Sequence, residues 1–275
     1  MPTYEDAVRA LKSPHLSDIL CLAEKHVPVA FRGRPWRHAE LAHGKGILVS
    51  DDALACYLAA YGRMHAVKMY QVLRRCALND LVPGFEVVDW GCGQGLASLC
   101  LIDHLRELGA PLPVRIVLVD ASAAALNRAG LHLDAVTGGT VTLERVKAAL
   151  PNSRNEQAWQ SGAIHGGQPL VLHLLSNIFD VPGIDLAALA RVIARTGKEN
   201  FVICAAHYNM RSELEKLCGQ FDPALRQDVF TAAQERFGRL PNAYVYGAAL
   251  KAFRIRQADA PEASSCEEEA LRLAA

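Results

Sequence analysis

Short apolar runs alternate with amphipathic stretches through the middle of the chain, and turn-forming residues separate them. Nearly continuous apolar runs indicate buried strands, whereas apolar positions three or four residues apart indicate helices. The predicted strands are 85–89, 114–120, 141–143, 170–176 and 201–206, followed by a late strand within 244–255. The predicted helices are 96–108, 121–129, 143–150, 185–194 and 224–237. This alternation predicts an α/β fold with a doubly wound, mostly parallel sheet.

The first 80 residues have a different, helical pattern. Short helices are predicted over 5–12 and 16–25, and a longer amphipathic helix from Ser50 to near Cys76. Its start carries a capping serine followed by two acids, which suits the first turn of a helix. One face of this helix carries polar-tipped side chains among apolar positions, which indicates a nearby pocket. These side chains are Tyr57, Tyr61, His65 and Lys68.

The change of pattern divides the chain into three parts. Residues 1–80 are predicted to form an α-helical extension that is a candidate substrate cap. Residues 81–256 form the α/β domain, and residues 257–275 a mobile acidic tail. Within the domain, the polar segment 137–168 is an insertion that we interpret as either disorder or a lid over a site.

Charge and composition narrow the classes of function. Lys+Arg and Asp+Glu number 29 each, so the formal net charge is zero. A domain that neutralises many phosphates is usually basic, and the balance therefore disfavours nucleic acid without excluding a local basic patch. No apolar run reaches the roughly 20 residues of a membrane span, and no secretory signal is evident. The eight scattered cysteines favour a cytoplasmic protein without a metal site.

The segment Val87-Val88-Asp89-Trp90-Gly91-Cys92-Gly93-Gln94-Gly95 lies between a predicted strand and a predicted helix. A glycine-rich turn at this place lets the backbone approach a ligand and directs helix N–H groups towards it. The residues after Gly95 lack the lysine of a phosphate-binding P-loop, and Leu96 stands where a dinucleotide fingerprint needs glycine. Asp120 closes the next strand, where a carboxylate can accept hydrogen bonds from both hydroxyls of a ribose.

Asp89-x-Gly91-x-Gly93-x-Gly95 with Asp120 resembles the motifs of class I, Rossmann-like S-adenosylmethionine-dependent methyltransferases, over about residues 85–255. The resemblance implies S-adenosylmethionine as cofactor, an antiparallel pair that finishes the sheet, and methyl transfer to an acceptor. It also implies that Asp89 supports the loop and the cofactor's amino group, while Asp120 holds the ribose. The implied cofactor contacts are Asp89, Gly91, Cys92, Gly93, Gln94, Gly95, Asp120, Ser176 and Asn177.

The segment after the fourth predicted strand bears on the acceptor. Amino-methylating enzymes of this family have an Asn/Asp/Ser-Pro-Pro-Tyr/Phe motif here. Ser176-Asn177-Ile178-Phe179 resembles it at the first and last positions but lacks both prolines, so we do not infer amino methylation from it. Ligands of parallel sheets bind beyond the carboxyl ends of the strands. The candidates that align the acceptor or take its proton are Asn177, His207, Tyr208 and His65. Cys204, inside a predicted strand, is interpreted as a core residue.

The acceptor itself and the oligomeric state stay open at this point. A small-molecule acceptor is favoured, and no membrane contact is expected. One alternative is an RNA-modifying methyltransferase whose basic segment 31–45 contacts the RNA through Arg32, Arg34, Trp36, Arg37 and Lys45. The other is a non-catalytic, methyltransferase-like binding subunit, although both acids and all three glycines of the motif are intact.

Overall fold

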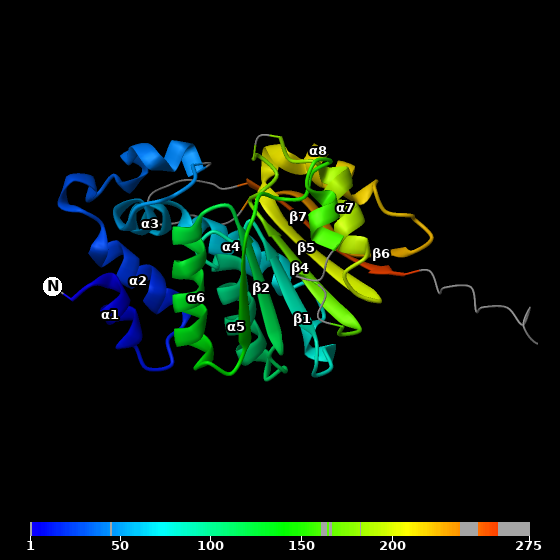
Figure 1. Ribbon diagram of the computed structural model, residues 1–275, viewed down its shortest axis with the longest axis horizontal. Helices are drawn as coiled ribbons and strands as arrows, with labels where there is room; N and C mark the ends of the chain where they lie inside the picture. The colour runs from blue at the N-terminus through cyan, green and yellow to red at the C-terminus, as the bar shows by residue number, and fades with distance from the viewer. Residues whose placement is uncertain are drawn as a thin grey trace, which may run out of the picture.

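The computed structural model describes residues 2–44, 46–160, 164, 167–181, 183–236 and 247–257. A seven-stranded sheet in the order β3-β2-β1-β4-β5-β7-β6 runs through the centre of the molecule (Figure 1). Its parallel strands are β1 Glu86–Trp90, β2 Arg115–Asp120, β3 Thr142–Lys147, β4 Leu170–Ser176 and β5 Glu199–His207. The last two are β6 Arg226–Arg236 and β7 Gly247–Arg256, and β7 is antiparallel to both β5 and β6. The predicted doubly wound, mostly parallel fold is confirmed.

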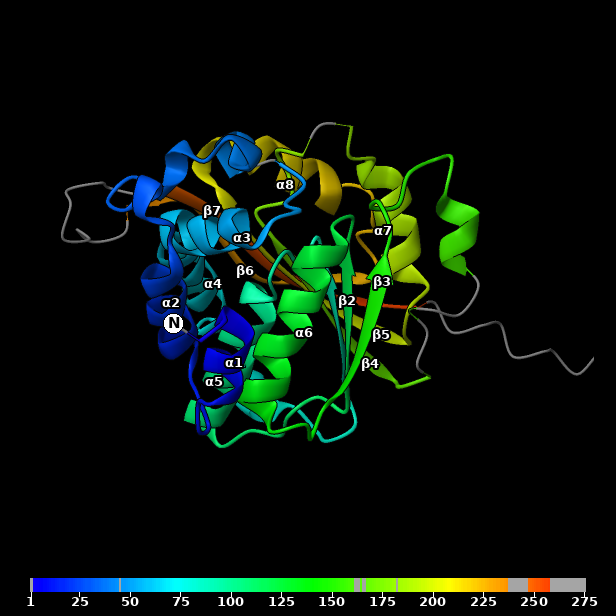
Figure 2. The ribbon, with the colours of Figure 1, turned by 60° about the vertical axis from the view of Figure 1, so that its left-hand side comes forward.

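Helices cover both faces of the sheet. One face carries α4 Arg63–Leu73, α5 Leu96–Leu108 and α6 Ala123–Thr137, with α1 Tyr4–Arg9 and α2 Leu16–His26 packed outside them (Figure 2). The other face carries α7 Leu186–Ala194 and α8 Arg211–Cys218. Each face has its own hydrophobic core, and the core of the first face continues into α1, α2 and α4. None of the helices among the described residues has the length and apolar character needed to cross a membrane.

The N-terminal extension is helical, as predicted, but its long helix is interrupted. Short 3-10 helices cover Val29–Phe31, Pro35–Arg37 and Ala39–Gly44, and α3 covers Asp51–Tyr57. Ser50 caps α3, since its side chain accepts a hydrogen bond from the backbone N–H of Ala53. A π-helical segment, Leu58–Gly62, then separates α3 from α4. Gly62 packs closely on α2 there, where a Cβ would lie 2.6 Å from Leu20 Cδ2.

Two predicted helices are strands at the edges of the sheet. The predicted helix 143–150 is wrong, because β3 extends to Lys147 and pairs with β2. An edge strand has one neighbour and is partly exposed, so it tolerates the polar residues that hide its strand character. The predicted helix 224–237 is also wrong, because Arg226–Arg236 forms β6 and pairs with β7. Two register shifts in β6 break the alternation by which a strand is recognised.

The ends of two other elements differ from the predictions. The helix predicted to stop before Gly130 continues to Thr137, and Gly138 in the left-handed conformation ends it. Gly130 lies inside the helix, and the guanidinium of Arg145 from β3 packs where a Cβ at this position would lie. The late strand begins at Gly247, and residues 244–246 of its predicted range lie outside the described residues. The predicted acidic tail, from residue 258 on, lies outside them too.

Candidate functional site

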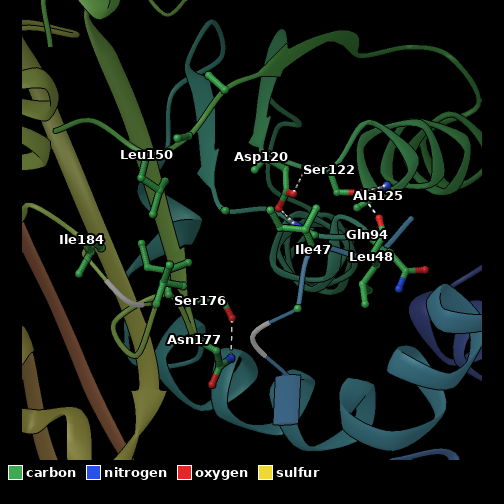
Figure 3. A pocket seen from close by; sticks show the side chains of 18 of the residues that line it. Ile47, Leu48, Gln94, Asp120, Ser122, Ala125, Leu150, Ser176, Asn177 and Ile184 are labelled. Carbon is green, nitrogen blue, oxygen red and sulfur yellow. Dashed lines mark hydrogen bonds between the residues drawn. The ribbon is translucent and has the colours of Figure 1, made fainter. Parts of the chain in front are cut away.

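A cavity of about 420 Å³ opens at the carboxyl ends of β1, β2 and β4 (Figure 3). Its volume lies within the usual range of small-molecule sites. β2 and β4 flank β1 on opposite sides, so the chain reverses its direction of winding here, which is where open α/β sheets bind ligands. Four segments line the cavity: the loop after β1, the turn after β2, the chain that follows β3, and the end of β4 with the turn that follows it. The fifth wall comes from residues 46–48 of the N-terminal extension.

The glycine loop forms the floor of the cavity next to β1. Gly91, Gly93 and Gly95 have φ of +62°, +52° and +80°, a region that favours glycine. A Cβ at Gly91 would lie 2.7 Å from Ile178 Cγ2, whereas no atom lies within 4 Å of a Cβ position at Gly93. Gly91 is therefore required by packing. Gly93 leaves open space at the cavity, as a loop that approaches a ligand closely requires.

Asp120 lies at the end of β2 and lines the cavity. Its Oδ2 accepts a hydrogen bond from the backbone N–H of Gly93 and its Oδ1 one from that of Ser122, both at 2.8 Å. These bonds hold the carboxylate in one orientation and leave each oxygen with capacity for a further hydrogen bond. Burial raises the pKa of Asp120 above its ordinary value, against the lowering effect of the backbone donors.

Asp89 lies behind the glycine loop and is fully buried. Its Oδ2 accepts hydrogen bonds from the Ser98 backbone N–H at 3.2 Å and from the Ser98 hydroxyl at 2.7 Å. The carboxyl group therefore ties β1 to the first turn of α5, where a helix favours negative charge. Burial raises its pKa to about 6. Asp89 supports the loop from behind and is not among the residues that line the cavity.

Two further loop residues fix the loop to its surroundings. The backbone N–H of Cys92 donates to the carbonyl oxygen of Val119 at 2.9 Å, and burial raises the pKa of the Cys92 thiol. Gln94 lines the cavity, and its Nε2 donates to the carbonyl oxygen of Leu54 at 3.0 Å. Its own carbonyl oxygen lies 3.1 Å from His132 Nδ1. The loop is therefore joined both to β2 and to the N-terminal extension.

The N-terminal extension closes one side of the cavity. The hydroxyl of Ser122 donates to the carbonyl oxygen of Leu48, and Arg128 forms an ion pair with Asp51 at 2.5 Å. These contacts hold residues 46–48 over the glycine loop, with Ile47 exposed at the rim. Sequence reasoning did not identify Ile47 or Leu48, because they belong to no motif and reach the site only through the fold.

Ser176 at the end of β4 and Asn177 in the turn that follows it both line the cavity. Asn177 has φ of +55°, and its backbone N–H donates to the carbonyl oxygen of Ala205 at 2.8 Å. Its Nδ2 donates to Ser176 Oγ at 3.0 Å (Figure 3). Its Oδ1 accepts from Lys68 Nζ, also at 3.0 Å.

Lys68 does not line the cavity but contacts Asn177, which does, and the sequence indicated it only indirectly. It lies on the polar-tipped face of the predicted long helix, but no motif singled it out. In the structure it belongs to α4 and is buried, with 1% of its surface exposed. Burial lowers the pKa of its ammonium to about 8, and the charge of Asp180 acts in the opposite direction.

Three of the predicted catalytic residues do not line the cavity. His65 is half-buried beside Tyr57 and Tyr61, and burial together with the charge of Lys68 lowers its pKa to about 3. His207 ends β5, and its Nδ1 lies 2.7 Å from Asn209 Oδ1. Tyr208 follows it, 47% exposed, with its ring against Gly247. An imidazole with a pKa near 3 is neutral and a weak base at pH 7, so His65 is poorly suited to accept a proton.

Cys204 lies in the middle of β5 and is buried, as predicted for a core residue. Burial raises the pKa of its thiol well above the ordinary value. Since the thiolate is the reactive form of cysteine, this side chain is chemically inert in the folded protein.

Comparisons with known proteins give no match to a family model and none to a curated protein. Several solved structures are similar. A precorrin-6y C5,15-methyltransferase from Geobacter metallireducens is 13% identical over 71% of this chain and 88% of its own, with a TM-score of 0.44. The magnesium protoporphyrin IX methyltransferase of Synechocystis, with bound cofactor, is 15% identical over 94% and 99%, with a TM-score of 0.44. A putative RNA methyltransferase from Pyrococcus horikoshii is 10% identical over 95% and 100%, with a TM-score of 0.41. At these identities the likeness is one of fold.

The strand order defines the class of fold without these comparisons. Five parallel strands are finished by an antiparallel β7 that lies between β5 and β6. The glycine loop follows β1 and the acid closes β2, both at the carboxyl edge of the sheet. The chain therefore has the α/β fold of class I methyltransferases.

Proposed function

We propose that the protein is an S-adenosylmethionine-dependent methyltransferase. The observation that carries the proposal is the placement of Asp120. Its carboxylate lines the cavity at the end of β2 and is held there by the backbone of Gly93 and Ser122. An acid fixed in this way, next to a glycine loop with open space, suits a ligand that combines a ribose with a group lying close to the backbone.

The residues around the cavity fit this cofactor. The backbone of residues 91–95 would hold its methionine portion, and Asp120 its two ribose hydroxyls. Leu150 and Ile184 line the cavity and provide apolar surface for a flat heteroaromatic ring. When bound, S-adenosylmethionine supplies a methyl group on a positively charged sulfur.

The chain contributes alignment and the exclusion of water to such a transfer. The positive charge on sulfur disappears during the displacement, so the enzyme mainly needs to bring nucleophile, methyl group and sulfur into line. The walls at 46–48 and 148–150 cover the cavity on two sides, which keeps water from the reacting atoms. Asn177 and Tyr57 line the same cavity and are the side chains that we expect to orient the acceptor.

Calorimetry with S-adenosylmethionine and S-adenosylhomocysteine tests the proposal. We expect micromolar binding by the wild type and a loss of at least about tenfold in Asp120→Ala, because hydrogen bonds to a charged acceptor contribute about 1.5–3 kcal/mol each. Asp134→Ala is the matched control, since Asp134 forms a surface ion pair with Arg145 and does not line this cavity. Absence of binding of both compounds to the wild type would overturn the proposal. Binding without methyl transfer to any acceptor would support the non-catalytic alternative.

A second candidate, an RNA-modifying methyltransferase, rests on the surface of the N-terminal extension. Trp36 is 56% exposed, and Arg32, Arg34 and Arg37 are exposed around it. The chain leads from this basic segment directly to the wall at 46–48, while Lys45 lies outside the described residues. Gel shifts with total RNA at increasing salt test this candidate, because phosphate contacts weaken steeply with salt. Equal binding by a variant with all three arginines replaced by glutamate would contradict it.

A further inference from the structure

The peptide group between Gln94 and Gly95 is held from two sides. Gln94 lies between two glycines with positive φ, Gly93 and Gly95, so few steric restraints act on the backbone here. At such a place the orientation of a peptide group depends on its hydrogen bonds. The N–H of Gly95 donates to the carbonyl oxygen of Cys92 at 2.8 Å. The carbonyl oxygen of Gln94, on the opposite side of the planar peptide group, lies 3.1 Å from His132 Nδ1.

His132 lies on α6 and is buried, with both ring nitrogens in hydrogen bonds. A carbonyl oxygen only accepts, so Nδ1 carries the proton and donates it to Gln94. Burial lowers the pKa of His132 to about 3, so the ring is neutral at pH 7 and Nε2 is an acceptor. The hydroxyl of Tyr4, whose pKa burial raises to about 12, lies 2.9 Å from Nε2 and donates to it. A path of hydrogen bonds therefore leads from α1 through α6 to the glycine loop.

The ring of Tyr4 is fixed by its own neighbours. The guanidinium of Arg128 lies 4.0 Å from the centre of the ring, within the range of a cation–π interaction. The ring of His26, at the end of α2, meets it edge-on at a centroid distance of 5.2 Å. Arg128 is held in turn by its ion pair with Asp51. Tyr4 therefore presents its hydroxyl to His132 from a defined position.

We propose that Tyr4 and His132 are positioning residues of the cofactor site. Neither is among the described residues that line the cavity, and both act through Gln94, which does line it. They fix the glycine loop before the cofactor binds, which lowers the free-energy cost of ordering the loop on binding. Helix α1 therefore contributes to the affinity for S-adenosylmethionine. This inference rests on the proposed methyltransferase function and adds two residues to its site.

Calorimetry with S-adenosylhomocysteine on the full chain at pH 7 compares the wild type with three variants. Tyr4→Phe should weaken binding about threefold, and His132→Gln about tenfold, because the net contribution of one hydrogen bond corresponds to about two- to tenfold. His132→Asn should weaken binding no more than about twofold. The asparagine amide lies near the position of Nδ1 and can still donate to Gln94, whereas the glutamine amide extends to the position of Nε2.

Tyr70→Phe is the matched control for the loss of a tyrosine hydroxyl. The hydroxyl of Tyr70 on α4 donates to Asp103 of α5 at 3.4 Å. Tyr70 also does not belong to the described cavity lining. We expect the affinity of this variant for S-adenosylhomocysteine to equal that of the wild type.

Nitrogen-15 NMR of the His132 ring tests the same inference in the wild type, without any variant. We expect the proton on Nδ1 and an unprotonated Nε2 at pH 7. The Nδ1 resonance should shift when S-adenosylhomocysteine saturates the protein, because its acceptor belongs to the glycine loop. A proton on Nε2, or ring resonances that do not respond to the ligand, would overturn the inference.

The outcomes of calorimetry separate this inference from the function on which it rests. Wild-type affinity in folded Tyr4→Phe and His132→Gln overturns the inference alone. Equal losses in His132→Asn and His132→Gln also overturn it, because they would reflect the loss of the ring and not of the donor to Gln94. Absence of S-adenosylhomocysteine binding to the wild type overturns the methyltransferase proposal and this inference together.

Discussion

Replacing Lys68 by methionine should make the protein more stable at neutral pH. Burial lowers the pKa of Lys68 from 10.5 to about 8, so the native state disfavours the charged form that the unfolded chain retains. At about 1.4 kcal/mol per pKa unit, this difference destabilises the native state by about 3 kcal/mol below pH 8. Methionine has a similar length and carries no charge. It leaves Asn177 Oδ1 without its donor, which costs about 1 kcal/mol.

The net expectation is a gain of about 2 kcal/mol in the free energy of unfolding at pH 7. The gain depends on pH with a defined sign. Between about pH 8 and 10.5 the unfolded wild type binds more protons than the native state, so the stability of the wild type rises with pH through this window. Above it Lys68 is neutral in both states and the penalty is absent. The advantage of the variant should therefore shrink between pH 8 and pH 10.

Urea unfolding followed by tryptophan fluorescence at pH 7 and pH 10 measures both quantities. Lys251→Met is the control and should lose stability at pH 7, because it breaks the pairing with Glu215 and Asp228. A Lys68→Met protein that is less stable than the wild type at pH 7 would refute the reasoning. So would an advantage of the same size at both pH values.

Two further predictions concern the glycine loop and the histidine that contacts it. Gly93→Ala should lower the free energy of unfolding by about 1 kcal/mol. It should also weaken the binding of S-adenosylhomocysteine, measured by calorimetry, at least tenfold, because its new Cβ enters the open space at the cavity. Gly109→Ala, with a comparable φ of +64° at the end of α5, is the control and should keep full affinity. His132, whose pKa burial lowers to about 3, binds its proton more readily in the unfolded chain, so stability should fall as the pH drops below 6.5. Between pH 6 and 4, the free energy of unfolding of His132→Gln should therefore fall less steeply with decreasing pH than that of the wild type, by about 1.4 kcal/mol per pH unit. Urea unfolding measures both slopes, and the same slope in variant and wild type would contradict the prediction.

The sequence determined those features that depend on neighbouring residues. The buried strands β1, β2, β4 and β5 are continuous apolar runs because both faces of the sheet are covered. The glycine loop is local as well, since its three positive φ angles fall on the three glycines of the motif. Ser50 caps α3 as its position before two acids predicted.

Tertiary structure decided whatever depends on residues that are far apart in the chain. β3 and β6 have helix-like or mixed sequences and become strands because the sheet offers each an edge with unpaired backbone groups. Gly130 lies inside α6, where Arg145 from the next strand packs against it. The same holds for the site: Lys68 meets Asn177, 109 residues further on, only when α4 packs on the sheet. Periodicity and motifs record the local environment of a residue, whereas the partner of a buried charge is fixed by the packing of whole elements.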